Sequence, residues 1–466
     1  MGQDDSANEL RGMLEGSAGL FEALRTVRSR RVGLGYRIDS GTVETHPSTG
    51  RKLPLQEEGP LKFVSEKEPV ALTEAQEALL CWAACGPNGI ANWDISMWGG
   101  FHELTHISGR TVPAAGNSMA TDLLVINDQG AFIYKPGLER SANVEIQGAA
   151  DGASKILDWY RKGMIQILDE RPDIDYSLRA PGAPHATLMG PYQHNMNKPG
   201  TTWFIPLTDV GWLNSALLNF FDFWHMYPID EWNGGRPAGV EKWVREGMLE
   251  LGTTIAAEEQ LIFQVEQYPT GMMVQNIRLA AESMGLGTWC YCGFNPDLLM
   301  GAMPEVARGL GFHVEAPNPK APVSTGQIKI FGIEGVKEAT YVPSPRFKNA
   351  EQLVEHWYAE KYGPGGPFHR GEENYLKKGR TPWKPGPTGV IAEHPRTMPA
   401  PWVKEALIAY IDYCVQNFGQ WPVTVNPMQA HFGVVVHQID EAFYDRYYRD
   451  GILTPRHRAE IARRGR

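Results

Sequence analysis

The stretch YPTGMMVQNIRLAAESMGLGTWCYCGFN, residues 268–295, limits the possible folds of this chain more than any other. Apolar side chains recur from Met273 through Ile277 to Met284, which predicts a helix with one apolar face that starts after Pro269. The glycines of GLG favour a turn after this helix, and the run TWCYC is rich in strand-forming residues. The sequence therefore predicts a buried helix, a glycine turn and a strand, in that order.

This stretch resembles the second sequence signature of the nitroreductase-like flavoproteins. The resemblance rests on Gln275 and Asn276, on LAAESMGLGTW, and on Cys292 and Gly293 before a phenylalanine. In that family the matching pair lies against the reactive edge of the flavin, which implies that Cys292, Gly293 and Gln275 belong to a cofactor site. Glycine suits this place because, without a Cβ, its backbone N–H can approach the ring nitrogen that accepts hydride.

A second segment, RTVPAAGN, resembles the turn that lies beneath the flavin in the same family. The resemblance assigns five consecutive residues to the cofactor site: Pro113, Ala114, Ala115, Gly116 and Asn117. Small side chains permit a close approach of the backbone to a flat ring, and an asparagine amide can bond to ring heteroatoms. The helix expected before this segment, with a capping box at Thr73 and Gln76, resembles the branch that oxidises peptide azolines.

Basic residues cluster in RSRR, where an N-terminal helix is expected to end. The family begins with a helix that runs into an Arg-x-Ser-x-Arg motif, which holds the flavin phosphate. Ser29 and Arg31 fit this motif, whereas Val27 stands at the place of the first arginine and Arg28 follows it. Guanidinium groups suit phosphate because they form bidentate hydrogen bonds. Arg28, Ser29 and Arg31 are therefore candidate phosphate ligands, with a solvated surface cluster as the alternative. In PSPRF, Arg346 stands where the family often places a late basic ligand.

A rival motif stands just before the second segment, since His102, Glu103 and His106 read H-E-x-x-H. On a helix the two histidines would face one way and could bind zinc, with the glutamate as base. Glycines lie close on both sides of the motif, so the apolar helix that should carry it is missing. We therefore expect no metal site, and a zinc metalloprotease is kept as an alternative.

Composition excludes several classes of function. The chain has 466 residues, a net charge of −10 and 42% hydrophobic residues, so its composition is that of a globular protein and argues against nucleic-acid binding. Apolar runs stay shorter than the roughly 18 residues of a membrane span, and the N-terminus has no apolar signal region, so we expect no membrane contact and a cytoplasmic protein. The five cysteines form no disulfide framework, and reduced thiols are expected.

The elements expected elsewhere predict an α+β protein. Strands are expected in DLLVIN, AFIYKP and IKIFGIEG, and a helix is expected throughout GASKILDWYRKGMIQIL. Further helices are expected across 212–225, 241–265 and 437–449, and in NAEQLVEHWYAEKYG and PWVKEALIAYIDYCVQNFG. The resemblance implies a nitroreductase-like mixed sheet surrounded by helices.

The resemblance also sets the expected domain boundaries. We expect a flavin-binding domain at 1–346, with a helical insertion near 145–250, and a C-terminal helical extension at 347–466. The amphipathic helices of the extension carry tryptophans and tyrosines that need an apolar surface. They either cover the flavin pocket and narrow its substrate range, or pack outside it and extend a dimer interface.

The resemblance implies an oxidoreductase that binds FMN noncovalently and passes hydride from a donor such as NAD(P)H to an organic acceptor. The flavin supplies the reactive atom, so we nominate no catalytic acid or nucleophile. The family also implies a homodimer in which each flavin site borrows residues from the other chain. Two further alternatives stay open: a dehydrogenase or oxidase of a peptide or small metabolite, and a partner-binding protein on a vestigial flavin fold.

Overall fold

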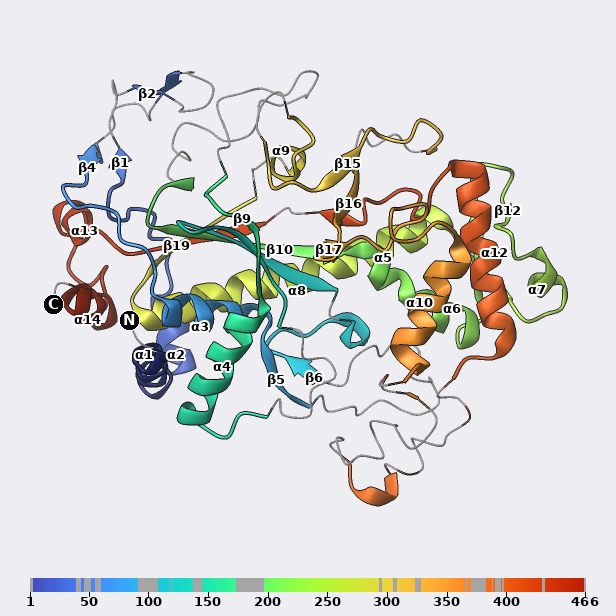
Figure 1. Cartoon of the computed structure of the whole chain (residues 1–466), viewed down its shortest axis with the longest axis horizontal. Helices are drawn as coiled ribbons and strands as arrows, with labels where there is room; N and C mark the ends of the chain where they lie inside the picture. Colours follow the sequence, from blue (N-terminus) through green and yellow to red (C-terminus); the bar gives the residue numbers. More distant parts are fainter. Residues whose placement is uncertain are drawn as a thin grey trace.

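The chain is an α+β protein built around one seven-stranded sheet (Figure 1). The computed structural model describes residues 3–38, 43–45, 52–54, 60–90, 108–118, 120–136, 145–172, 197–292, 296–304, 308–322, 328–364, 366, 368–369, 383–387, 389, 395, 398–429 and 432–464.

The seven-stranded sheet is antiparallel in every pairing described for it. Its order is β14 (Gly287–Tyr291), β19 (Gly433–His437), β10 (Thr201–Asp209), β7 (Thr121–Asn127), β8 (Gly130–Tyr134) and β9 (Met164–Leu168), with β18 (Met428–Gln429) also paired to β10. The expected mixed sheet is therefore wrong for these strands. β7 and β8 are joined by the predicted tight turn, a connection that only antiparallel strands permit.

β10 lies in the middle of the sheet and is buried along its whole length. This strand falls inside 145–250, where a helical insertion is expected, so that expectation is wrong for TTWFIPLTD. A strand that is covered on both faces lacks the alternation of apolar and polar residues that marks a half-buried strand. Sequence pattern alone therefore misses the central strand of the fold.

β19 brings the last quarter of the chain into the sheet. It lies between β14 and β10, where Val435 pairs with Trp203 on one side and Trp289 on the other. The sheet thus continues past residue 346, and the part at 347–466 is not purely helical. His437 ends this strand, and the helix expected from 437 begins only at α13 (Glu441–Tyr447), after Asp440 accepts a hydrogen bond from the Ala442 N–H.

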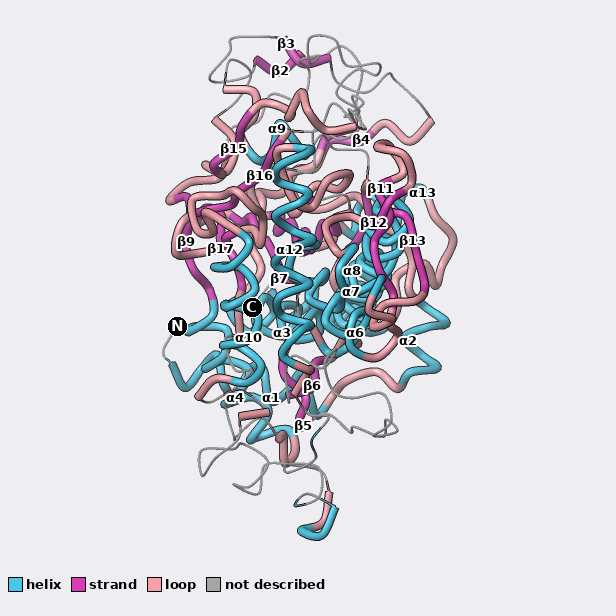
Figure 2. The backbone as a smooth tube through the Cα atoms, turned by 90° about the vertical axis from the view of Figure 1, so that its right-hand side faces the viewer, coloured by secondary structure: helices cyan, strands magenta, loops and turns pink. Residues whose placement is uncertain are grey.

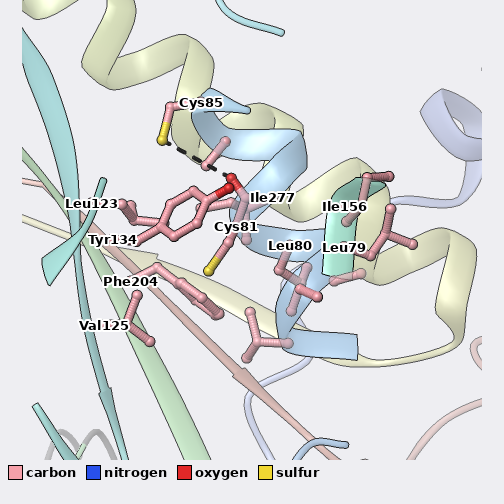
Figure 3. Packing of buried hydrophobic residues seen from close by; sticks show 14 of the residues in the cluster. Leu79, Leu80, Cys81, Cys85, Leu123, Val125, Tyr134, Ile156, Phe204 and Ile277 are labelled. Atoms are coloured by element: carbon pink, nitrogen blue, oxygen red, sulfur yellow. Dashed lines mark hydrogen bonds between the residues drawn. The ribbon is translucent and has the colours of Figure 1, made fainter. Parts of the chain in front are cut away.

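One face of the sheet is covered by three helices: α3 (Glu74–Cys85), α4 (Ala149–Gly163) and α8 (Ile255–Met284). Figure 3 shows their side chains meeting those of the sheet, with Ile277 of α8 and Leu80 of α3 near Phe204 of β10. The predicted capping box of α3 is confirmed, because Thr73 accepts from the Gln76 backbone N–H and Gln76 returns a bond to the Thr73 N–H.

Alternate residues of the sheet face a second apolar cluster on its other side. Val125 faces the three helices, whereas its neighbours Leu124 and Ile126 pack toward α9 (Pro296–Met300) and the small sheet that contains the expected strand IKIFGIEG. Because strand residues alternate between faces, burial on both sides requires the nearly continuous apolar runs seen in β7 and β10.

α8 is longer than the sequence pattern predicts, since it begins at Ile255 and passes through Pro269. Thr254 caps its start by accepting a hydrogen bond from the Ala257 N–H. A proline inside a helix removes one backbone hydrogen bond and normally favours a break. Here the apolar face on both sides of the proline, at Ile262 and Met273, is buried, and tertiary packing outweighs that loss.

Two other expected helices are shorter than predicted. α4 ends at Gly163, and MIQIL continues as β9, because those residues pair with the edge of β8. The stretch 212–225 divides into α5 (Val210–Leu213), a 3-10 turn and α6 (Leu217–Asp222). In 241–265 a short α7 (Glu241–Arg245) and the strand β13 (Leu251–Thr254) precede α8.

The C-terminal helices α10 (Ala350–Tyr362) and α12 (Pro401–Phe418) are confirmed and pack with α6 against the start of α8. Figure 2, which looks at that end of the molecule, shows α6, α7, α10 and α12 gathered there. The other elements are α1 (Gln3–Glu15), α2 (Leu20–Thr26), α14 (Pro455–Arg464), β1 (Arg37–Ile38), β2 (Val43–Thr45), β3 (Lys52–Pro54), β4 (Phe63–Val64), β5 (Pro87–Ile90), β6 (Ser108–Arg110), η2 (Ala115–Asn117), β11 (Met226–Asp230), β12 (Arg236–Pro237), β15 (His313–Glu315), β16 (Lys329–Ile333) and β17 (Lys337–Glu338).

The position of β19 predicts that its side chains contribute strongly to stability. Val435→Ala should lower the free energy of unfolding by about 2 kcal/mol, because two buried methyl groups are removed between two tryptophans. Val70→Ala, at a position 42% exposed, should change it by less than about 0.5 kcal/mol. Urea denaturation measures both, and equal effects would contradict the central place of β19.

Candidate functional site

The predicted order of helix, glycine turn and strand is confirmed at the end of α8. Gly285 ends the helix with φ 76°, in the left-handed conformation that glycine adopts easily, and β14 begins two residues later. A Cβ at Gly287 would collide with the ring of His437 on the neighbouring strand β19. The second glycine therefore permits β14 to lie close to β19 at this point.

The RSRR segment lies against β14, although about 260 residues separate the two in sequence. The backbone N–H of Arg30 donates to the carbonyl oxygen of Thr288 at 2.9 Å. The guanidinium carbon of Arg31 lies 4.5 Å from the ring centroid of Trp289. The segment expected to hold phosphate and the strand expected to lead to the flavin ring are thus neighbours.

A buried ion pair fixes this contact. Arg30 is 2% exposed, and its Nη1 donates to Oε2 of Glu282 on α8 at 2.6 Å. Its other nitrogens donate to the carbonyl oxygens of Thr26 and Ile452. Burial raises the pKa of Glu282 and lowers the pKa of Arg30, while the opposite charge of each partner counters these shifts. The close contact favours the ionised pair, because either charge alone would be buried without compensation.

His437 supports the same segment from the sheet. Its two ring nitrogens lie 3.0 Å from the carbonyl oxygen of Arg30 and 3.1 Å from that of Gln438. Two carbonyl acceptors favour the charged imidazolium, but complete burial opposes it, and the nearby charge of Arg464 opposes it further. Burial dominates and lowers the pKa of His437 to about 4.

The segment that leads into the PAAGN turn contacts α8. Asn276 donates through Nδ2 to the carbonyl oxygens of Ala83 and Thr111, both at 3.1 Å, which ties α8 to α3 and to the start of this segment. Within the turn, Gly116 and Asn117 have φ of 56° and 51°, and the Asn117 amide donates to the Ser108 carbonyl oxygen.

Gln275 lies on α8, the helix that packs against β14. Nη1 of Arg278 donates to its Oε1 at 3.0 Å. On β14, burial raises the pKa of the Cys290 thiol, and the positive charge of Arg278 offsets part of this rise. Cys292, two residues on, is exposed. Gln275 therefore belongs to the helix that supports the strand expected to lead to the flavin ring.

A basic cavity of about 400 Å³ opens beside the RSRR segment. One wall comes from the end of α2 and the other from the loop between α13 and α14. The lining residues are Arg25, Thr26, Arg28, Arg30, Tyr448, Arg449, Asp450, Gly451, Ile452 and Thr454. Four arginines face one aspartate, so the cavity suits a small anion. Its volume lies within the range of small-molecule sites.

The structure places the predicted site residues on separate segments that border α8 and β14. Arg28 lines the basic cavity, and Ser29 and Arg31 are exposed beside it. Thr111, two residues before the turn at 113–117, is hydrogen-bonded to Asn276 of α8, and Gln275 is on the same helix. Gly293 lies outside the described residues, as does the H-E-x-x-H motif at 102–106.

Arg346 lies elsewhere in the chain. Its Nε is 3.2 Å from a carboxylate oxygen of Glu338, and its guanidinium lies over the ring of Phe347. Phe347 belongs to the apolar cluster that includes Ile255, the first residue of α8, whereas Arg30 contacts the last turn of that helix. Arg346 and the RSRR segment therefore lie at opposite ends of α8 within one chain. Figure 1 shows the same separation between α10, which follows Arg346, and α2, which precedes the RSRR segment.

Sequence reasoning missed three residues of this region: Glu282, Arg449 and His437. Glu282 gave no signal, because a glutamate in the last turn of a helix is ordinarily exposed. Arg449 belongs to RYYRDG, a basic and aromatic run, but its place beside Arg28 depends on the tertiary fold. His437 was expected in a helix, and its strand position became evident only from its pairing with β10 and β14.

Comparison with known proteins leaves the chain without an assigned family. No protein-family profile and no curated protein sequence matches it. One solved structure with some likeness is a candidate nitroreductase from Ralstonia eutropha JMP134, which shares 18% identity over 59% of this chain and 90% of its own, with a TM-score of 0.24. A likeness this distant identifies neither a family nor an activity. In the described part of the chain, no helix has both the length and the apolar character to cross a membrane.

The pKa of His437 predicts how stability changes in mild acid. The folded protein keeps this histidine neutral down to about pH 4, whereas the unfolded chain binds a proton below its ordinary pKa of 6.5. The free energy of unfolding should therefore fall as pH decreases from 6.5 to 4, with roughly 3 kcal/mol of this loss due to His437.

Urea denaturation across this pH range tests the assignment. His437→Asn should show a smaller decrease in unfolding free energy between the two pH values than the wild type. His313→Asn, at a side chain that is 53% exposed, should keep the wild-type slope. An unchanged slope in His437→Asn would contradict the neutral state of the buried ring.

Proposed function

We propose that this protein is an FMN-dependent oxidoreductase of the nitroreductase-like class. The observation that carries the proposal is the contact between the RSRR segment and β14, through the Arg30 N–H and the Thr288 carbonyl. The family resemblance assigns the two segments to opposite ends of one cofactor, and their adjacency does not follow from either sequence pattern. A flavin mononucleotide is the class of ligand that would contact both segments, one through its phosphate and the other through its ring.

The basic cavity fits the phosphate end of the cofactor. Arg28 can donate charge-assisted hydrogen bonds to phosphate oxygens, and Ser29 adds a short hydroxyl donor on the same exposed segment. The surrounding guanidinium groups provide the positive potential that a doubly charged phosphate requires. We therefore place the phosphate beside α2, with Arg31 as a further candidate ligand.

The ring end is proposed to lie near the end of β14. Cys292 is exposed there, and Gln275 lies on α8, the helix that packs against this strand. The PAAGN turn offers small residues, and Thr111, which precedes it, is hydrogen-bonded to α8. In this arrangement the ring is bound and oriented by Gly293, Gln275 and the PAAGN turn. Arg346 contributes to the site only if it comes from a second chain.

The proposed reaction passes hydride between NAD(P)H or an organic substrate and an organic acceptor. Bound FMN supplies the atom that accepts and returns the hydride. The part of the protein is to bind the cofactor, to hold its phosphate through arginine side chains and to leave one edge of the site open to a second molecule. This division of tasks requires no catalytic acid or nucleophile from the chain.

The direct test is the flavin content of the purified protein. We expect a yellow preparation with ~1 FMN per chain, either as isolated or after incubation with FMN. Arg28→Gln should weaken FMN binding, whereas Arg346→Gln should leave it unchanged unless a second chain supplies that residue. A preparation that stays colourless with added FMN, together with bound zinc that is lost in His102→Ala, would favour the metalloprotease instead.

We further propose a homodimer, for which an exposed apolar stripe on α8 provides the support. Leu261, Tyr268 and Met272 are 47%, 62% and 42% exposed, and their spacing places them on one side of the helix. Gln275 continues the same stripe by one turn. A partner that covers this stripe would reach the proposed flavin site, because Gln275 belongs to both.

A second exposed apolar surface lies on α2. α2 packs against α8, and its residues Leu20, Phe21 and Leu24 are all more than half exposed. Apolar side chains concentrated on adjacent helices are typical of protein interfaces. The helix that leads into the RSRR segment therefore also belongs to the proposed interface.

A charge on the stripe should separate the two chains. Met272→Glu should convert the dimer to a monomer and weaken FMN binding, because a carboxylate would be buried at the interface. Leu61→Glu, at an exposed leucine in the turn before β4, should do neither. Light scattering measures the mass of each variant. A wild-type monomer at micromolar concentration would refute the dimer.

A further inference from the structure

We propose that Arg449 is a second phosphate-binding arginine of the basic cavity, supplied by the C-terminal loop that faces the RSRR segment. This inference rests on the proposed function, because it takes the anion to be the phosphate of FMN. It assigns a binding role to a residue that no sequence motif indicates. It also divides the four arginines of the cavity into two that bind the anion and two whose charge is already compensated.

Arg30 is committed to the protein. All three nitrogens of its guanidinium donate to protein acceptors, namely Glu282 and the carbonyl oxygens of Thr26 and Ile452. Its side chain is nearly inaccessible, and its charge is balanced by the 2.6 Å ion pair. It therefore joins the two walls of the cavity and is a poor donor to a ligand.

Arg25 is also compensated, although it is exposed. Its Nη2 lies 2.8 Å and 2.9 Å from the two carboxylate oxygens of Glu22, one turn earlier on α2. A ligand would have to displace this carboxylate to gain the full charge of the guanidinium. Arg25 is thus a weaker partner for an anion than an arginine without a carboxylate.

Arg28 and Arg449 differ from these two. Nη1 of Arg28 donates to the backbone carbonyl oxygens of Arg25 and Val27, contacts that fix the side chain without neutralising it. Among the described residues, neither Arg28 nor Arg449 takes part in an ion pair, and both are exposed. Asp450 is the one carboxylate among the cavity's lining residues. Two guanidinium groups on opposite walls therefore exceed the local negative charge.

The loop that carries Arg449 is held in place. The Ile452 N–H lies 3.4 Å from the Arg449 carbonyl oxygen, which closes a tight turn through Gly451, whose φ is 90°. The Ile452 carbonyl oxygen then accepts from Arg30, so the buried ion pair also holds this second wall. After the loop, Thr454 is bonded to Nδ1 of His457 at the start of α14. A fixed loop can present an arginine at a defined place on the cavity.

The chemistry of the ligand follows from this charge. Two guanidinium groups on facing walls suit the doubly charged, many-acceptor phosphate of a monoester. A neutral sugar alcohol would leave both charges without a partner. Arg449 is therefore expected to distinguish FMN from riboflavin, which has the same ring but no phosphate.

The test compares Arg449→Gln with Arg446→Gln in the full-length protein. Arg446 is a matched control, since it lies three residues earlier, is exposed, and has its guanidinium over the ring of Tyr447 and not in the cavity. Calorimetric titration with FMN should show at least about tenfold weaker binding in Arg449→Gln and no change in Arg446→Gln. Riboflavin should bind both variants and the wild type equally.

The failures of the two proposals can be distinguished. If Arg449→Gln binds FMN as the wild type does while Arg28→Gln binds it more weakly, the assignment of Arg449 is wrong and the proposed function stands. If the wild type binds neither flavin, the proposed function is wrong. Titration with inorganic phosphate then tests whether the cavity binds an anion. Phosphate binding that is lost in Arg449→Gln and kept in Arg446→Gln supports the anion site. Equal phosphate binding by both variants, or binding of an adventitious ion only, overturns the assignment of Arg449.

Discussion

Two buried carboxylates, one near each end of α8, connect this helix to parts of the chain that are distant in sequence. Near the start, Glu259 accepts from the backbone N–H groups of Val423 and Thr424, both at 2.6 Å. In the last turn, Glu282 forms the ion pair with Arg30. Loss of the partners of either carboxylate would leave a buried polar or charged group without compensation, so both contacts strongly favour one arrangement. The N-terminal and C-terminal segments are thereby held to the same helix.

The candidate site depends on this arrangement. Because Glu282 holds Arg30, the RSRR segment lies against β14. Because Arg30 also bonds to Ile452, the C-terminal loop forms the second wall of the same cavity. The site therefore combines the beginning, the middle and the end of the chain around the final turns of α8. A site of this kind forms only when the whole chain has folded, which explains why no single segment shows it.

Sequence reasoning succeeded where local chemistry decides the structure. The capping box at Thr73, the glycine turn at Gly285 and the hairpin of β7 and β8 are all as predicted. It failed where contacts with distant parts of the sequence determine the structure. MIQIL forms a strand because it pairs with β8. β10 shows no alternation of apolar and polar residues because both of its faces are buried. The same holds for the candidate site. Motifs indicate Arg28 and Gln275, but only the fold shows that Glu282 pairs with Arg30 and that Arg449 lines the same cavity as Arg28.

One flavin is proposed to contact the RSRR segment, the PAAGN turn and the end of β14. Hydrogen–deuterium exchange with and without FMN tests this proposal directly, because a bound ligand slows exchange of the amides that it covers. We expect slower exchange at 28–31, 113–117 and 289–293, with no change at 350–362 in α10. Protection confined to α10 and its surroundings, or no protection at a saturating FMN concentration, would contradict the proposed site.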